Sequence, residues 1–100
     1  MANTFKVLFR GAAALTSTTL YTVPASTTTL ISSIVVTNTA ATTATYNLLL
    51  NDVSIGTLVS VPANDSALLE IKQVISAGQT IKALASATTV NFHLSGLEIT

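Results

Sequence analysis

The segment IVVTNTAATTATYNLLLN, residues 34–51, contains two apolar runs separated by a linker of threonine, alanine and asparagine. In the second run large apolar residues recur at every other position, which is the period-two pattern of a half-buried β-strand. The linker, residues 38–43, has the small and polar residues of a turn. We therefore expect a strand, a turn and a second strand, with almost no charge in the turn.

The first of these two strands is apolar on both faces. Leu30 and Ile34 share one face, whereas Ile31 and Val35 share the other. Strands of this kind lie in the middle of a sheet that is covered on both sides. The pattern predicts a central strand, or one whose outer face meets another subunit.

Similar short strands, separated by turn signals, continue along the whole chain, and threonine is abundant, as suits a pleated surface. One segment, residues 66–72, also fits a single helical turn. The sequence predicts an all-β fold: one antiparallel β-sandwich domain over residues 1–100, jelly-roll-like, with an immunoglobulin-like strand order as the alternative. The expected strands, about eight in number, are 5–10, 18–24, 28–39, 43–51, 57–62, 66–72, 80–86 and 89–99.

Five positions carry specific turn or backbone expectations. Asn51-Asp52 has the chemistry of a tight hairpin turn, with Gly56 as a permissive position shortly after it. Gly78 is expected at a sharp turn. Gly96 lies inside a strand pattern, which indicates a bulge or a close approach of another backbone.

The N-terminal strand is the candidate for contact with another protein. Alternation places Phe5, Val7 and Phe9 on one face and Lys6 and Arg10 on the other, where Leu8 interrupts the polar pattern. Residues 1–17 are considered as an N-terminal arm. Within it, we select a docking set for a neighbouring molecule: Phe5, Lys6, Leu8 and Arg10.

Charge is scarce. The chain of 100 residues has four basic and four acidic side chains and a net charge of zero, and charged residues make up 8% of it, against about 25% in typical soluble domains. An uncharged surface of this kind promotes association. The scattered Lys and Arg residues argue against nucleic acid. The chain has no cysteine, no apolar run long enough for a membrane helix and no pattern of a signal peptide, so we expect synthesis in a cytoplasm, no membrane partner and no disulfide.

The residues for catalysis are few. His93 shares a strand face with Ser95, but Glu98 lies on the opposite parity, so no Ser-His-acid arrangement is expected. With one histidine and no cysteine, a zinc site lacks ligands. We expect no enzyme activity, no cofactor and no metal. The carboxylates are scattered in turn or strand contexts: Asp52, Asp65, Glu70 and Glu98.

Two binding functions remain as alternatives. Ice-binding surfaces use flat Thr-X-Thr ladders, and that spacing occurs at Thr37/Thr39 and at Thr43/Thr45, without a regular repeat. Carbohydrate-binding modules use exposed aromatic platforms, but the chain has five aromatic residues and most fall at expected core positions.

Four motifs resemble those of small structural proteins of tailed bacteriophages, cyanophages among them. They are LYTVPA at residues 20–25, the strand pattern at 31–39, the AGQ turn region at 75–83 and the closing strand with SG at 90–98. The resemblance covers most of the chain from Thr18 onward. It implies a compact β-sandwich that assembles on a virion, often as a trimer, and it implies no catalytic residue.

The motifs resemble those of virion proteins with different positions, and among these we expect a capsid decoration (cement) protein that stabilises the head by bridging capsomers. Such a protein binds the major capsid protein as a homo-oligomer, and Lys6 and Arg10 of the docking set would meet an acidic capsid surface. A tail-fibre or baseplate component that adsorbs to the host is the alternative. In both cases the protein is synthesised in the host bacterial cytoplasm and ends in the virion.

Overall fold

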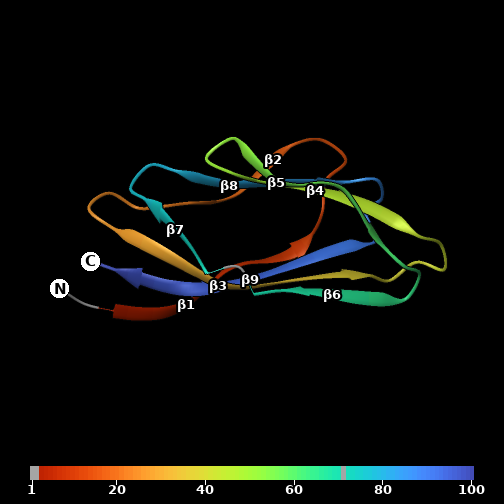
Figure 1. Ribbon diagram of the computed structural model, residues 1–100, viewed down its shortest axis with the longest axis horizontal. Coiled ribbons are helices and arrows are strands. Elements are labelled where there is room, and N and C mark those ends of the chain that lie inside the picture. Colours follow the sequence, from red (N-terminus) through yellow and green to blue (C-terminus); the bar gives the residue numbers. More distant parts are fainter. Residues whose placement is uncertain (1–2, 71) are drawn as a thin grey trace.

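The computed structural model describes residues 3–70 and 72–100 and shows an all-β sandwich of two antiparallel sheets (Figure 1). Sheet A has the order β1-β9-β3-β6, with β7 also paired to β3, and sheet B has the order β2-β8-β4-β5. The predicted fold class is confirmed. The strands are β1 Asn3–Ala12, β2 Thr18–Thr22, β3 Thr28–Asn38, β4 Ala44–Leu50, β5 Val53–Val61, β6 Asp65–Leu69, β7 Gln73–Ser76, β8 Thr80–Ala85 and β9 Val90–Ile99.

The strand order is that of a jelly roll. β6 and β7 pair with successive halves of the same strand, β3, and so act as one interrupted strand. Counted in this way, the chain alternates between the two sheets, except that the hairpin β4-β5 stays in sheet B. This gives two interleaved four-stranded sheets, the double Greek key of jelly rolls. The immunoglobulin-like alternative is not observed.

The segment 34–51 connects the centres of the two sheets. β3 lies between β9 and the β6/β7 pair in sheet A, and β4 lies between β8 and β5 in sheet B. Both strands are therefore interior strands, as the apolar pattern on both faces of β3 predicts. The crossing is fixed by the buried Asn38, whose Nδ2 donates to the carbonyls of Thr42 at 2.7 Å and Val61 at 3.2 Å.

The core lies between the sheets and is built from alternate residues of the central strands. Phe92 of β9 packs edge-on against Tyr46 of β4, with ring centroids 5.8 Å apart and an interplanar angle of 82°. Aromatic pairs in this geometry stabilise a core beyond the area they bury. The fully buried side chains around them come from both sheets and include Ile31, Ile34, Leu48, Ile81 and Leu94.

The turn expectations are largely confirmed. Asn51 and Asp52 both have positive φ, 50° and 63°, as a two-residue hairpin between β4 and β5 requires. Gly78 has a φ of 81° at its sharp turn. A Cβ on Gly96 would clash with the carbonyl oxygen of Leu30, so the expected close backbone approach is present. Gly56 lies within β5 and has no positive φ, so its expected role in the turn is wrong.

Several strand expectations need correction. β5 begins at Val53 rather than at residue 57, and β7 lies outside the expected strands. In β3 the register shifts between Ile31 and Ser33, so Ile31 and Ile34 both face the core instead of lying on opposite faces.

Within the segment expected at 66–72, the described residues 66–69 belong to a strand and not to a helical turn. Asp65–Leu69 is a strand, and the chain then leaves it before β7, with Ile71 outside the described residues. The predicted alternation of the N-terminal strand fails at Leu8, where the register shifts between Val7 and Phe9. This bulge turns Leu8 into the core and leaves Phe9 partly buried against it.

The segment considered as an arm is part of the sandwich. β1 pairs with β9 from Asn3 to Ala12, and residues 1 and 2 lie outside the described part of the chain. β1 is the edge strand of sheet A. Any docking by this segment therefore uses its exposed side chains and its free strand edge.

Candidate interaction surface

The outer face of sheet A carries a continuous apolar row across four strands. The odd-numbered residues of β9 face away from sheet B, because Phe92 and Leu94 between them are fully buried in the core. On this outward side, Leu97 pairs with Phe5 on β1 and with Leu30 on β3. Leu30 in turn pairs with Val74 on β7. The apolar row, as we name it, consists of Phe5, Leu97, Leu30 and Val74.

The two ends of the apolar row are open to solvent. Phe5 is 89% exposed and Val74 is 63% exposed, while Leu30 and Leu97 between them are half-buried by their neighbours. Single exposed apolar side chains are ordinary on protein surfaces, but a contiguous apolar patch marks a site of interaction. The exposed Val7 lies on the same face of β1, one outward position further along.

The rows on this outer face become more polar with increasing distance from the apolar row, towards the end of the sheet where Ala12 and Asn91 lie. The register places Arg10, His93, Val35 and Leu68 in one cross-strand row. The next row, at the far end of the sheet, consists of Ala12, Asn91, Thr37 and Ser66. There the hydroxyls of Thr37 and Ser66 lie 3.0 Å apart and share a hydrogen bond. The outer face of sheet A thus has an apolar end, near Asn3 and Ile99, and a polar end.

The four residues of the predicted docking set do not form one surface. Phe5 and Arg10 are exposed, but Leu8 is buried and cannot contact a partner. Lys6 pairs with Glu98, with the Nζ and Oε2 atoms 3.4 Å apart. Sequence reasoning missed Leu30, Val74 and Leu97. For Leu30 the signal was present, because apolar residues on both faces of β3 indicate an outer face that meets something.

An inter-sheet polar cluster lies beneath the apolar row. The hydroxyl of Tyr21, on β2 of sheet B, lies 2.9 Å from the hydroxyl of Thr29 and also hydrogen-bonds to Glu98, both in sheet A. Burial, and secondarily the bond to Glu98, raises the pKa of Tyr21 to about 12. Tyr21 therefore stays a neutral donor at ordinary pH, and the cluster ties the two sheets together.

The residues considered for catalysis are dispersed by the fold. His93 and Ser95 lie on the outer face of sheet A, whereas Glu98 faces inward to Tyr21 and Lys6. Asp52 pairs with Lys82 at 2.8 Å on sheet B, and Asp65 accepts a hydrogen bond from the backbone of Ser66. Within residues 3–70 and 72–100, no three His, Cys, Asp or Glu side chains gather where they would hold a metal ion.

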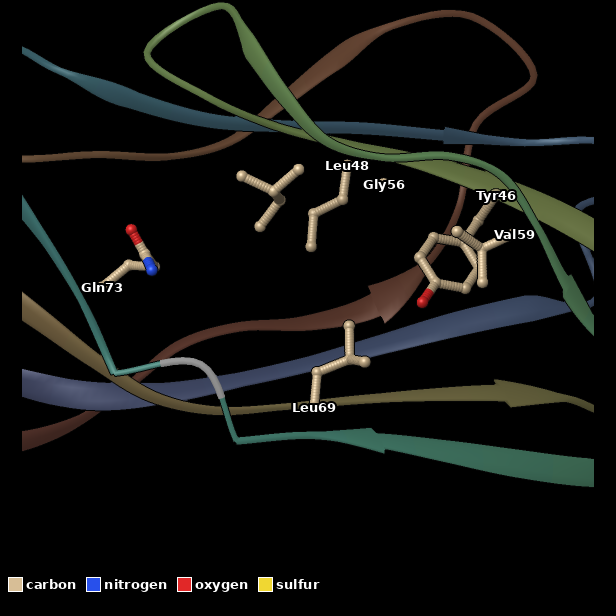
Figure 2. A pocket seen from close by; sticks show the side chains of 7 residues that line it. Tyr46, Leu48, Gly56, Val59, Leu69 and Gln73 are labelled. Atoms are coloured by element: carbon tan, nitrogen blue, oxygen red, sulfur yellow. The ribbon is translucent and has the colours of Figure 1, made fainter.

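A small cavity opens at the edge of the sandwich between β5 and the β6/β7 side (Figure 2). Its volume is about 190 Å³. In Figure 2, Leu69 from sheet A and Leu48 and Tyr46 from sheet B approach it from opposite sides. The lining is mainly apolar, with Gln73 as a polar side chain at one end. Nothing about this cavity supplies a reactive group.

The structure separates the features that suggested ice or carbohydrate binding. Thr37 lies on β3 of sheet A and Thr45 on β4 of sheet B, so the two Thr-X-Thr pairs do not form one flat array. Tyr21, Tyr46 and Phe92 are buried and Phe9 is partly buried. Phe5 alone among the five aromatic residues is exposed, so they form no aromatic platform.

Comparison of the chain with known protein families, curated proteins and solved structures gave no match. The part of the chain that the structure describes contains no helix long and apolar enough to cross a membrane.

Proposed function

We propose that this protein is a non-enzymatic structural component of a virion, and more specifically a capsid decoration protein that stabilises the head by bridging capsomers as a homo-oligomer. The single observation that carries the proposal is the apolar outer face of sheet A. A face built from Phe5, Leu97, Leu30 and Val74 in one row is suited to being covered by protein. The motif resemblance to phage structural proteins is the reason for proposing a virion as the assembly in which this face is covered.

The electrostatics support an assembled rather than an isolated state. Two of the four basic side chains, Lys6 and Lys82, form ion pairs with Glu98 and Asp52, which leaves fewer unpaired charges at a surface whose net charge is already zero. A surface with so little charge promotes association with other molecules, because there is little charge repulsion between them. In an assembly the same property is favourable, because few charges lose their hydration when copies and partners cover the face.

The fold is compatible with this role and with others. Jelly rolls occur in viral capsid proteins and in lectins, and a fold alone does not assign a function. The exposed Arg10 on β1, beside the free strand edge, is the cationic group that would meet an acidic capsid surface. The major capsid protein is therefore the proposed partner, and β1 provides the edge for it.

The test is the number of copies per particle. Virions produced from the genome that encodes this chain are purified and their proteins quantified against the major capsid protein. A decoration protein is expected in a fixed, high ratio to the capsid protein, and it is expected to leave the heads less resistant to heat when its gene is deleted. Absence of the chain from purified particles overturns the proposal.

The same measurement distinguishes the tail alternative. A tail-fibre or baseplate component is expected at a few copies per particle, on tails separated from heads, and its deletion is expected to reduce adsorption to the host rather than head stability. A low copy number in the tail fraction would therefore replace the decoration role by this one.

A further inference from the structure

The apolar row on the outer face of sheet A is similar when read from either end, with a leucine at both inner positions and an apolar side chain at both outer ones. In the apolar row, the strand order is β1-β9-β3-β7, so two strands lie on each side of the line between β9 and β3. A two-fold axis parallel to the strands along this line brings each cross-strand row onto the same row of another copy. Such isologous contacts are the commonest basis of homodimers.

We propose that the outer face of sheet A binds a second copy of this chain, face to face, about a two-fold axis that runs between β9 and β3. In this arrangement Leu97 of one copy faces Leu30 of the other, and the bulky Phe5 faces the smaller Val74. The inference deepens the proposed function, since it rests on the proposed self-assembly and names the surface that mediates it.

The other rows are also compatible with this packing. The row with Arg10 places the aliphatic stem of this side chain over Leu68 of the second copy, at the edge of the sheet where the guanidinium still reaches water. At the polar end, Asn91 faces Thr37, so an amide group meets a hydroxyl group with which it can form a hydrogen bond. Among the paired residues that the structure describes on this face, no row opposes two acidic or two basic side chains.

The size of the face fits a stable dimer. A ten-residue strand such as β1 or β9 is about 33 Å long, and four strands span about 19 Å, so the face projects to roughly 600 Å². Standing side chains raise the accessible area above this projection, towards the ~800 Å² per partner of standard protein interfaces. Two sheets meeting in this way pack about 10 Å apart, as in other sheet-on-sheet contacts.

The test compares two valines that are matched in exposure. Val74→Glu places a charge at the end of the apolar row, and Phe5→Glu does so at the other end. Val53→Glu is the control, because Val53 is 65% exposed, against 63% for Val74, but lies on β5 of sheet B. Each variant and the original chain are studied by sedimentation at micromolar concentration, with circular dichroism to verify the β-fold.

We expect the original chain and Val53→Glu to sediment as dimers, and Val74→Glu and Phe5→Glu to dissociate at least tenfold more readily. A monomeric original chain, or a dimer that Val74→Glu and Phe5→Glu leave unchanged, overturns the inference. A trimer, the state that the phage resemblance implies, also overturns the two-fold packing.

Failure of this inference and failure of the proposed function give different results. If the chain is abundant in particles but monomeric in solution, the virion role stands and the face has another occupant, such as the capsid. If the chain dimerises through this face but is absent from particles, the interface stands and the decoration role fails.

Discussion

At the scale of single residues, Asn38 is the polar side chain on which the crossing between the sheets depends. It is fully buried. Its Nδ2 donates to the carbonyls of Thr42, Val61 and Pro62, and its Oδ1 accepts hydrogen bonds from the backbone N–H of Ala40 at 3.1 Å and from the hydroxyl of Thr89 at 3.3 Å. One amide therefore joins the β3-β4 turn, the end of β5 and the loop before β9. Every side-chain polar atom that is buried in residues 3–70 and 72–100 already has a hydrogen-bond partner. No unpaired buried side chain is therefore available to take over the hydrogen bonds of Asn38.

We predict that Asn38→Ala lowers the free energy of unfolding by about 3 kcal/mol, because it leaves buried carbonyl and N–H groups unsatisfied. Urea denaturation measures the loss. Asn91→Ala, on the outer face of sheet A, is the control and is expected to change stability by less than about 1 kcal/mol. Equal losses for the two variants would mean that Asn38 has no special role in the crossing.

A second residue-scale prediction contrasts two glycines. A Cβ on Gly96 meets the backbone carbonyl of Leu30, which cannot move without disturbing the pairing of β3 and β9. A Cβ on Gly56 meets the side chain of Val59 at 3.3 Å, and Val59 lines the cavity and has room to shift. We expect Gly96→Ala to cost roughly 3 kcal/mol or more, whereas Gly56→Ala is expected to be neutral or to stabilise by up to about 1 kcal/mol. Thermal denaturation of both variants checks the order, which a larger loss for Gly56→Ala would contradict.

At the scale of elements, the edge strand β5 contains a strained position. Leu58 has a φ of 49° and is 69% exposed, while its backbone N–H is held by the side chain of Asn47 at 2.8 Å. A leucine rarely adopts this left-handed conformation, because its Cβ crowds the following carbonyl. Leu58 lies in a bulge of β5. Tyr46 and Leu48 of β4 pair with Val59 and Gly56, and the register shifts between these two pairs. Irregular edges of this kind hinder edge-to-edge pairing with other chains.

We predict that Leu58→Gly stabilises the protein by about 0.5–1 kcal/mol, because relief of the backbone strain exceeds the added entropy of the unfolded chain. Leu68→Gly is the matched control. Leu68 is 60% exposed on β6 and has no positive φ, so the same substitution there is expected to destabilise by about 1 kcal/mol. Chemical denaturation of the pair tests the difference, and a loss of stability in both variants would contradict it.

The elements also show what the sequence predicts and what it does not. Period-two patterns predict the positions of β2, β3, β4, β8 and β9 well, because apolar residues alternate along most of each strand. The faces of β3 are predicted less well, since the bulge between Ile31 and Ser33 brings Ile31 and Ile34 onto the same face. The bulge at Leu8 was not predictable, since it arises from the register of β1 against β9, which are at opposite ends of the chain. The outer apolar row was missed for the same reason. Phe5, Leu30, Val74 and Leu97 become neighbours only through three long-range pairings.

At the scale of the whole molecule, the two sheets are joined by the polar cluster of Tyr21, Thr29 and Glu98 as well as by the apolar core. The contribution of this cluster to the free energy of unfolding depends on pH, and the raised pKa of Tyr21 determines the direction of that dependence. A tyrosine in the unfolded chain has a pKa of about 10, and in the folded protein the pKa of Tyr21 is about 12. Between these values the folded state keeps a proton that the unfolded state releases.

We therefore predict that the contribution of Tyr21 is fully present below about pH 10 and is lost as the pH rises from about 10 to about 12. Urea denaturation of the original chain and of Tyr21→Phe, across this range, measures it. The variant is expected to be less stable than the original chain at neutral pH, because Thr29 and Glu98 lose their partner, and to lose less stability above pH 10. Some alkaline dependence is expected to remain in Tyr21→Phe, since burial also raises the pKa of Tyr46. Parallel pH profiles of the free energy of unfolding for the two proteins would contradict this prediction. They would mean that the protonated hydroxyl of Tyr21 does not stabilise the contact between the sheets, and that the apolar core alone does so.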